Sequence, residues 1–286
     1  MDRRPDGYHD IRTVMGTVTL SDTIEISLRR AERAGVITSV TREGEAPGEV
    51  PEGPGNLAHI AAELFLERAG LQLEASIRLT KRIPAGAGLG GGSSDAAAVL
   101  RLMRAATRTD PGIEELARAI GSDVPFCLSG GIALVRGRGD LVTPLPRRQG
   151  LPVVLLLSPA VSISTSWAYA TLDEKRTSLT PQTPVPDNLD PVPDWPEDHA
   201  FPTDLRNDFL PVVLNRFEEL RDTMRLLESA RCRNWGLSGK GPTFYALFGT
   251  GDEADRFISG APERESLRLV KAHLTGPVPA GASSNW

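Results

Sequence analysis

The sequence predicts a chain of two domains that mix β-strands with α-helices, and three observations support this. The chain has 286 residues, 40% of them hydrophobic, which is more than a single core usually serves. Stretches in which apolar residues alternate, typical of half-buried strands, occur between stretches with the helical spacing of apolar residues. Residues 144–150 have the proline- and glycine-containing composition of a connection. We therefore expect domains at residues 1–146 and 147–286.

The centre of the first domain is a glycine loop at residues 83–94, which reads Ile-Pro-Ala-Gly-Ala-Gly-Leu-Gly-Gly-Gly-Ser-Ser. Apolar residues before it alternate, as on one face of a strand: Leu73, Ala75, Ile77 and Leu79. Strong helix formers follow it from Asp95 onward. Glycines let backbone N–H groups approach a ligand closely, and the N-terminus of a helix favours an anion. The order strand, loop and helix therefore indicates a phosphate site.

Two known nucleotide-binding patterns are incomplete in this loop. The spacing G-x-G-x-x-G is present, but the acidic residue about 20 residues later, Asp110, lies in a turn-like Thr-Asp-Pro-Gly and not at the end of a strand. The Walker A pattern needs a lysine where this chain has Ser93 and Ser94. These serines could act as an N-cap, contact Mg²⁺ or a phosphate, or do both. The alternative is a structural glycine turn before a capped helix.

The remaining elements follow from the same rules in chain order. Apolar alternation predicts strands within residues 17–28, and short apolar runs predict strands at 132–135, 151–157 and 244–248. Helical spacing predicts helices at residues 56–69, 112–120 and 207–230. Residues 180–203 contain seven prolines and five acidic residues, so we expect a mobile loop there. We also expect the tail to be frayed from Gly276 onward.

Composition excludes several classes of function. A net charge of −5 and a pI near 5.5 argue against nucleic acid or an anionic membrane as the main partner. The longest apolar runs are too short to cross a bilayer, and we expect no signal peptide before the fold. Cys127 and Cys232 make neither a disulfide framework nor a zinc-ligand spacing. We expect a soluble, cytoplasmic protein in which both thiols are buried.

Four segments together resemble the GHMP kinases. They are Arg-Arg-Pro-Asp-Gly-Tyr-His at residues 3–9, the glycine loop with the Asp-Ala-Ala-Ala after it, Ser-Asp-Val-Pro-Phe at residues 122–126, and Leu-Ser-Gly-Lys-Gly-Pro-Thr at residues 237–243. The resemblance covers nearly the whole chain, from Arg3 to about Gly249. It implies a two-domain α+β GHMP kinase fold, with a ribosomal protein S5 domain 2-like N-terminal domain that binds ATP and a ferredoxin-like C-terminal domain.

The three glycines followed by two serines, and the Tyr-His near the start, resemble one group of these kinases. That group phosphorylates the 2-hydroxyl of 4-diphosphocytidyl-2-C-methyl-D-erythritol, in the non-mevalonate pathway to isoprenoid precursors. The resemblance implies ATP and Mg²⁺ as cofactors, a cytidine diphosphate derivative as the small-molecule substrate, and a monomer or homodimer. The alternative within the family is a kinase for homoserine, mevalonate or a sugar.

The resemblance also assigns residues around ATP and the reacting hydroxyl. Asp123 matches the family's catalytic aspartate and would accept or orient the proton of the hydroxyl that attacks the γ-phosphorus. The plainer alternative is a turn aspartate bonded to its own backbone. Asn56 would lie near the nucleotide base. The residues that would wrap the phosphates are Pro84, Ala85, Gly86, Ala87, Gly88, Leu89, Gly90, Gly91, Gly92, Ser93 and Ser94.

On the substrate side, the resemblance implies that Tyr8 and His9 hold the cytosine by stacking and hydrogen bonding, with Tyr169 as a second stacking face. Ser238 and Gly239, in the second glycine turn at residues 238–243, would lie near the substrate phosphates. Lys240 stands where many relatives carry serine. It either adds a cation beside a phosphate or points to solvent.

The family begins with a strand of Ala-Lys-Ile-Asn-Leu-like sequence that would precede Met1. Its lysine is regarded as a second catalytic residue, and neither Lys81 nor Lys240 matches its position. We expect that the natural protein starts further upstream. The alternative is a weakened or inactive nucleotide-binding relative of the kinases.

Overall fold

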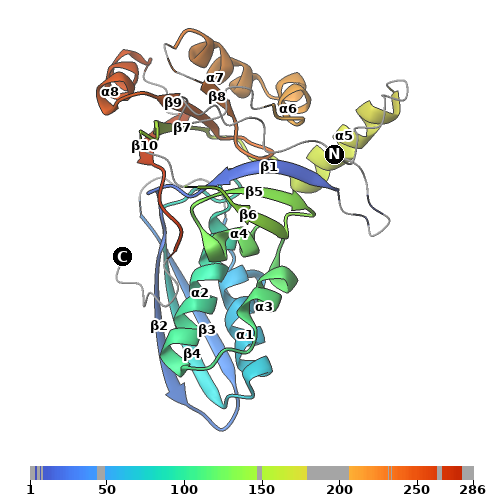
Figure 1. The fold of residues 1–286 in the computed structure, drawn as a ribbon, viewed down its shortest axis with the longest axis vertical. Coiled ribbons are helices and arrows are strands. Elements are labelled where there is room, and N and C mark those ends of the chain that lie inside the picture. Colours follow the sequence, from blue (N-terminus) through green and yellow to red (C-terminus); the bar gives the residue numbers. More distant parts are fainter. Residues whose placement is uncertain are drawn as a thin grey trace. The chain divides into compact units, whose positions relative to one another are not determined.

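Figure 1 shows the fold in a computed structural model, which describes residues 4, 7, 9–43, 49–146, 150–178, 206–230, 232, 234–262 and 266–278. The chain divides into two compact units. Unit 1 comprises Met1–Ala85, Gly90–Arg147 and Thr275–Trp286, and unit 2 comprises Gly86–Leu89 and Arg148–Leu274. The chain therefore changes unit near residue 147 and at two further places. The tip of the glycine loop belongs to unit 2, and the C-terminal segment belongs to unit 1. The division into two continuous domains, at residues 1–146 and 147–286, stays a prediction.

The first sheet of unit 1 has the strand order β2-β4-β3, from β2 (Thr23–Arg30), β3 (Gly35–Arg42) and β4 (Leu73–Lys81). Strand β4 runs antiparallel to β2 and parallel to β3. The alternation read from the sequence is confirmed, since Ala75, Ile77 and Leu79 on β4 are all buried. The strand delivers the chain directly into the glycine loop.

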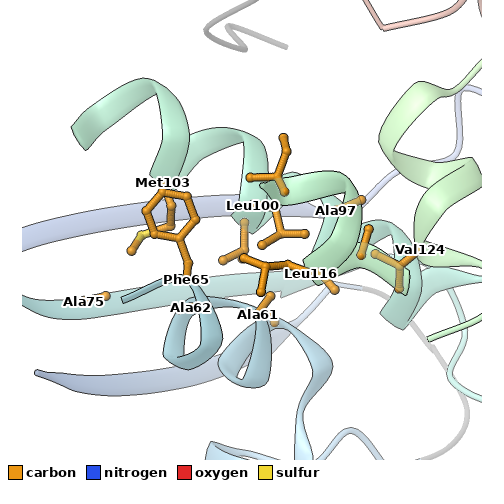
Figure 2. Close-up of a cluster of buried hydrophobic side chains, with 14 of the residues drawn as sticks. Ala61, Ala62, Phe65, Ala75, Ala97, Leu100, Met103, Leu116 and Val124 are labelled. Atoms are coloured by element: carbon orange, nitrogen blue, oxygen red, sulfur yellow. The ribbon is translucent and has the colours of Figure 1, made fainter. Parts of the chain in front are cut away.

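Helices α1 (Leu57–Ala69), α2 (Gly91–Thr107) and α3 (Ile113–Ile120) cover one face of this sheet (Figure 1). The two helices predicted at residues 56–69 and 112–120 are therefore confirmed. Their apolar side chains fill one core with the sheet (Figure 2), and Phe65, Leu100 and Met103 are fully excluded from water there. This packing fixes α2, and with it the helical end of the glycine loop, against the sheet.

A second sheet in unit 1 has the order β1-β5-β6, from β1 (Ile11–Gly16), β5 (Ile132–Gly137) and β6 (Leu141–Pro144), and the short helix α4 (Val124–Ser129) precedes β5. The expected fraying from Gly276 is wrong at Pro277 and Val278. Pro277 bridges Gly130, and the Val278 N–H donates to the Ser129 carbonyl at 2.9 Å. Backbone pairing with unit 1 outweighs the tendency of a chain end to fray.

Unit 2 is built on one antiparallel sheet of order β10-β7-β9-β8. Its strands are β7 (Val153–Pro159), β8 (Asn234–Leu237), β9 (Phe244–Phe248) and β10 (Leu267–His273), and its helices are α5 (Thr165–Ser178), α6 (Leu210–Arg216), α7 (Glu218–Glu228) and α8 (Gly251–Gly260). Every residue of β7 is buried, as its continuous apolar run predicts. The single helix predicted at residues 207–230 is wrong, because the backbone is extended at Phe217 (φ −108°, ψ 117°) and divides it into α6 and α7.

Within the described ranges, no helix combines the length and apolar character needed to cross a membrane. The proline-rich loop predicted at residues 180–203 and the substrate contact predicted for Tyr8 lie outside the described residues.

Candidate phosphate-binding and catalytic site

The glycine loop has the backbone geometry of an anion site. Gly86, Gly88 and Gly90 have positive φ angles of 69°, 75° and 66°, whereas Ala87 and Leu89 between them do not. Alternation of this kind turns successive N–H groups toward one side and forms a concave nest of donors. Glycine enters this region of φ without a steric penalty, which explains the spacing of glycines in the sequence.

Helix α2 begins at Gly91, four residues earlier than the helix-forming run predicted. Its first internal bond joins the Ser94 N–H to the Gly90 carbonyl at 2.9 Å, so the N–H groups of Gly91, Gly92 and Ser93 have no carbonyl partner in the helix. The N-cap is Gly90, and it has no side-chain cap. An N-cap role for the serines is therefore wrong, and the Ser94 hydroxyl donates instead to the Gly91 carbonyl at 2.7 Å.

These three N–H groups and the positive end of the α2 dipole are available to a phosphate. The donor set fits the phosphate chain of ATP, because such a chain offers only acceptor oxygens and negative charge. The predicted phosphate contacts of residues 84–94 stay a prediction about a ligand, and this geometry supports it.

Asp123 lies immediately before α4, with φ −89° and ψ −11°, and its side chain makes no capping bond. Burial raises the pKa of its carboxyl above the ordinary value of 3.8, and no donor among the described residues offsets this. The alternative of a turn aspartate bonded to its own backbone is therefore wrong. A largely desolvated carboxylate without donors is costly to the fold, and such groups are concentrated at functional sites.

Unit 1 brings Asp123 and the beginning of α2 to the same end of its core. The charges of Asp123 and of Asp95 on α2 both act on Cys127 of α4, whose pKa rises to about 12, mainly through burial and against the opposing effect of Arg101. The Arg101 guanidinium donates to the Cys127 carbonyl at 2.9 Å and ties α2 to α4. The two cysteines, expected to be buried, are each partly exposed.

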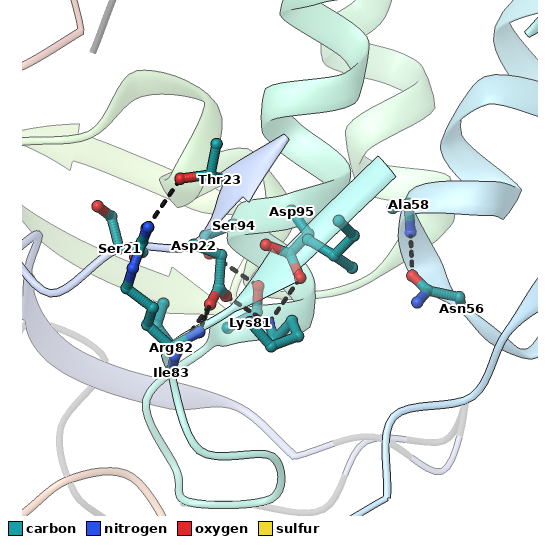
Figure 3. Close-up of polar contacts among 12 residues, drawn as sticks. Ser21, Asp22, Thr23, Asn56, Ala58, Lys81, Arg82, Ile83, Ser94 and Asp95 are labelled. Carbon is teal, nitrogen blue, oxygen red and sulfur yellow. Dashed lines mark hydrogen bonds and ion pairs between the residues drawn. The ribbon is translucent and has the colours of Figure 1, made fainter. Parts of the chain in front are cut away.

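The sequence interpretation missed a buried ion cluster of Asp22, Lys81 and Asp95 at the base of the glycine loop (Figure 3). The Lys81 ammonium donates to Asp22 and, at 2.7 Å, to Asp95, and the three side chains are only 2–4% exposed. Burial raises the pKa of Asp95 to about 7, and Lys81 opposes this rise. The overlooked signal was the alternation on β4, since Lys81 is the next inward position after Leu79.

Asn56 is the N-cap of α1. Its side-chain oxygen accepts from the Ala58 N–H at 2.9 Å, its amide donates to the Pro51 carbonyl at 2.9 Å, and the residue is 5% exposed (Figure 3). The structure therefore gives Asn56 a capping role. Its place near the nucleotide base stays a prediction.

In unit 2, the second glycine turn binds the tip of the glycine loop. The Ser238 hydroxyl donates to the Gly88 carbonyl at 2.8 Å, and the Thr243 N–H donates to the Ala87 carbonyl at 3.2 Å. This hydroxyl is thus already used in holding the loop. A contact of Ser238 and Gly239 with substrate phosphates stays a prediction.

Two side chains brace the second glycine turn. The Asn207 amide donates to the carbonyls of Leu237 and Gly239 at 2.9 and 2.7 Å. Lys240 is half-buried and donates to the Ile163 carbonyl, and burial lowers the pKa of its ammonium. Of the two alternatives for Lys240, a side chain pointing to solvent is therefore wrong, while a contact with a bound phosphate stays a prediction.

The remaining substrate nominees lie on different units. His9 is partly exposed just before β1 in unit 1. Tyr169 lies on α5 in unit 2, where its ring packs edge-on against Phe209, with 4.9 Å between centroids and an interplanar angle of 86°. Contact of these side chains with a cytosine stays a prediction.

Comparison with known proteins agrees with the geometry in each unit. The sequence-family model for the GHMP kinases N terminal domain matches residues 56–131, which include the glycine loop and Asp123. The model of the GHMP kinases C terminal domain matches residues 200–266, which include the second glycine turn.

Relatives match over most of the chain. The 4-diphosphocytidyl-2-C-methyl-D-erythritol kinase of a Geobacter species is 36% identical over 94% of this chain and 90% of its own length. The kinase of the same name from Citrifermentans bemidjiense is 37% identical over 87% of this chain and 84% of its own.

A crystal structure of 4-(cytidine 5'-diphospho)-2C-methyl-D-erythritol kinase matches with a TM-score of 0.70 and 31% identity, over 96% of this chain and 93% of that one. Homoserine kinase from Cytophaga hutchinsonii has a TM-score of 0.62 at 17% identity, over 94% of this chain and 95% of that one, which shows the fold alone. The predicted two-domain fold is confirmed, and this chain belongs to the GHMP kinases.

Proposed function

We propose that this chain is an ATP-dependent kinase that phosphorylates the 2-hydroxyl of 4-diphosphocytidyl-2-C-methyl-D-erythritol. The observation that carries the proposal is the Asp123 carboxylate, desolvated and without a donor among the described residues, in the same unit as a helix whose first N–H groups lack carbonyl partners. Relatives at 36–37% identity carry the name of this activity. The neighbour named for homoserine has only 17% identity, so nothing favours that substrate.

The N–H groups of Gly91, Gly92 and Ser93 would donate to the phosphates of ATP and orient the γ-phosphate. The raised pKa of Asp123 makes its carboxylate a stronger base than an exposed aspartate. It would accept, or at least orient, the proton of the attacking hydroxyl. Mg²⁺ bound with ATP would neutralise phosphate charge, and the Ser93 hydroxyl is the chain's candidate ligand for it.

We place this activity in the cytoplasm, and we expect neither nucleic acid nor a membrane as a partner because the net charge is −5. The cytosine of the substrate would meet Tyr8, His9 and Tyr169. Monomer and homodimer are both compatible with this proposal.

The test measures substrate-dependent ADP release by the protein and by its Asp123→Ala and Asp123→Asn variants. We expect kcat to fall by roughly 10²–10⁴-fold in both, the range that one general base supplies. Homoserine and mevalonate serve as control substrates. ADP release with either of them, but not with the cytidine substrate, would assign the chain to the alternative kinases.

The melting temperatures separate loss of catalysis from loss of fold. Because burial raises the pKa of Asp123, the folded protein binds more protons than the unfolded chain between pH 3.8 and the raised pKa, and stability falls as pH rises through that window. Asp123→Asn removes this penalty, so it should melt at or above the wild-type temperature near pH 7. An inactive variant that melts well below it would contradict a catalytic role.

Nucleotide and substrate binding provide an independent measurement. A ligand that binds only the folded state raises the melting temperature. We expect ATP and a cytidine diphosphate compound each to do so. Stabilisation by ATP alone, without turnover of any of the three substrates, would assign the chain to the nucleotide-binding relatives.

A further inference from the structure

The two ends of the glycine loop converge on the same buried ion cluster (Figure 3). At the entry, the Asp22 carboxylate accepts the N–H groups of Arg82 and Ile83 at 2.5 and 2.9 Å, where β4 ends. At the exit, Asp95 lies in the second turn of α2. Lys81 donates to both carboxylates and so joins the entry to the exit across 14 residues of chain.

We propose that Lys81, Asp22 and Asp95 are positioning residues that hold the two ends of the glycine loop together and thereby set its affinity for the phosphates of a nucleotide. The inference rests on the proposed function, since it takes a nucleotide phosphate as the ligand of this loop.

The chemistry of the position argues that the cluster does more than fill space. The inward positions before Lys81 on β4 are Ala75, Ile77 and Leu79, all buried and apolar. Another aliphatic residue could continue that pattern. It would give the fold comparable stability, because a buried ion pair is often no more stabilising than well-packed hydrophobic residues. The charged group adds a defined geometry, because hydrogen bonds to two carboxylates fix the position of the ammonium.

The position of the ammonium relative to α2 supports the same reading. A Cβ atom added to Gly91 would lie 3.3 Å from the Lys81 Nζ. The ammonium therefore lies directly against the first residue of α2, whose N–H group has no carbonyl partner in the helix. Movement of Lys81 would move the start of the helix, and with it the proposed phosphate donors.

The test is the dissociation constant of ADP by calorimetry, measured beside the melting temperature. Asp95→Ala removes the tie to α2 but leaves Lys81 paired with Asp22, so no buried charge loses its only partner. Asp95→Asn keeps an oxygen that can accept from Lys81. Ile77→Ala is the matched control, at a buried position on β4 four residues from Lys81 whose side chain is purely apolar.

We expect Asp95→Ala to weaken ADP binding roughly tenfold, which corresponds to about 1.4 kcal/mol. We expect Asp95→Asn to stay within about threefold of the wild type, because a neutral acceptor restores much of the tie. Ile77→Ala should melt at a lower temperature, through its cavity, with unchanged ADP affinity. The KM for ATP should follow the dissociation constants, while the KM for the cytidine substrate stays constant.

Unchanged ADP affinity in Asp95→Ala would overturn the proposal and leave the cluster a purely structural role. If Asp95→Ala does not fold, Asp95→Ser takes its place, because the serine side chain is shorter than that of aspartate and cannot reach Lys81. Weakened ADP binding in Asp95→Ser would then support the proposal, and unchanged ADP binding would overturn it. ADP binding needs no cytidine substrate, so a chain that binds ADP without turnover refutes the proposed function alone. A folded wild-type chain that does not bind ADP refutes both.

Discussion

Gly88 is the described glycine at which an added Cβ atom would come closest to another stretch of backbone, so replacing it with alanine has two separable costs. Its φ is +75°, a region in which a side chain costs about 1–2 kcal/mol. A Cβ atom there would also lie 2.6 Å from the Ser238 carbonyl oxygen and 2.7 Å from that of Gly241. Carbon and oxygen normally approach to about 3.3 Å, so the second glycine turn must shift. Such overpacking typically costs about 1–3 kcal/mol more.

Gly86→Ala is the matched control, because it has a similar φ of +69° but its Cβ would meet only the Ser162 hydroxyl, at an ordinary 3.6 Å. We expect Gly86→Ala to cost about 1–2 kcal/mol and Gly88→Ala about 2–5 kcal/mol. For a unit of this size each kcal/mol lowers the melting temperature by about 2–4 °C.

Calorimetry of the two variants and the wild type, at one protein concentration and without nucleotide, measures this difference. A further fall of several degrees in Gly88→Ala relative to Gly86→Ala would support the contact between loop tip and turn. Equal melting temperatures for the two variants would refute the reasoning, because the clash with the second glycine turn would then carry no cost.

Three further predictions follow from single contacts. Asn207→Asp should destabilise unit 2 more than Asn207→Ala, because a carboxylate would face two carbonyl oxygens where the amide now donates. Equal melting temperatures of the two variants would contradict this. Asn56→Ala should cost about 0.5–2 kcal/mol, whereas Asn56→Ser keeps a capping oxygen for the Ala58 N–H and should cost less. Thermal unfolding measures both, and the reverse order would exclude the cap. With a pKa of about 12, the Cys127 thiol should resist iodoacetamide at pH 8 until the protein unfolds. Peptide mapping measures the modification, and modified Cys127 in a folded sample would contradict its desolvation.

Local patterns in the sequence predicted the elements that carry the candidate site. Alternation on β4 and helical spacing in α1 and α3 are signals that the residues carry without tertiary contacts. The four segments that resemble the family led to the fold because their order, more than any one of them, is specific. Asp123 was selected by that resemblance alone, and its desolvation became visible only in the packed unit.

The errors arose where tertiary contacts override local preference. Glycines disfavour helices, so the sequence placed the start of α2 after Ser94, whereas packing extends the helix back to Gly91. The sequence analysis did not place Lys81 on the inward face of β4, because a lysine is rarely buried unless it is paired, and here the pairing is with Asp22 and Asp95. Sequence spacing could not reveal this pairing, since Asp22 precedes Lys81 by 59 residues.

The most direct measurement of the central claim is the transfer of radioactive label from the γ-phosphate of ATP to 4-diphosphocytidyl-2-C-methyl-D-erythritol, compared with Asp123→Asn. Label transfer excludes ATP hydrolysis, which ADP release alone does not. We predict labelled product with the wild-type chain and a loss of roughly 10²-fold or more in the variant. Equal labelling by both proteins, or none by a folded chain that binds ATP, would contradict the claim that this loop and Asp123 form a kinase site.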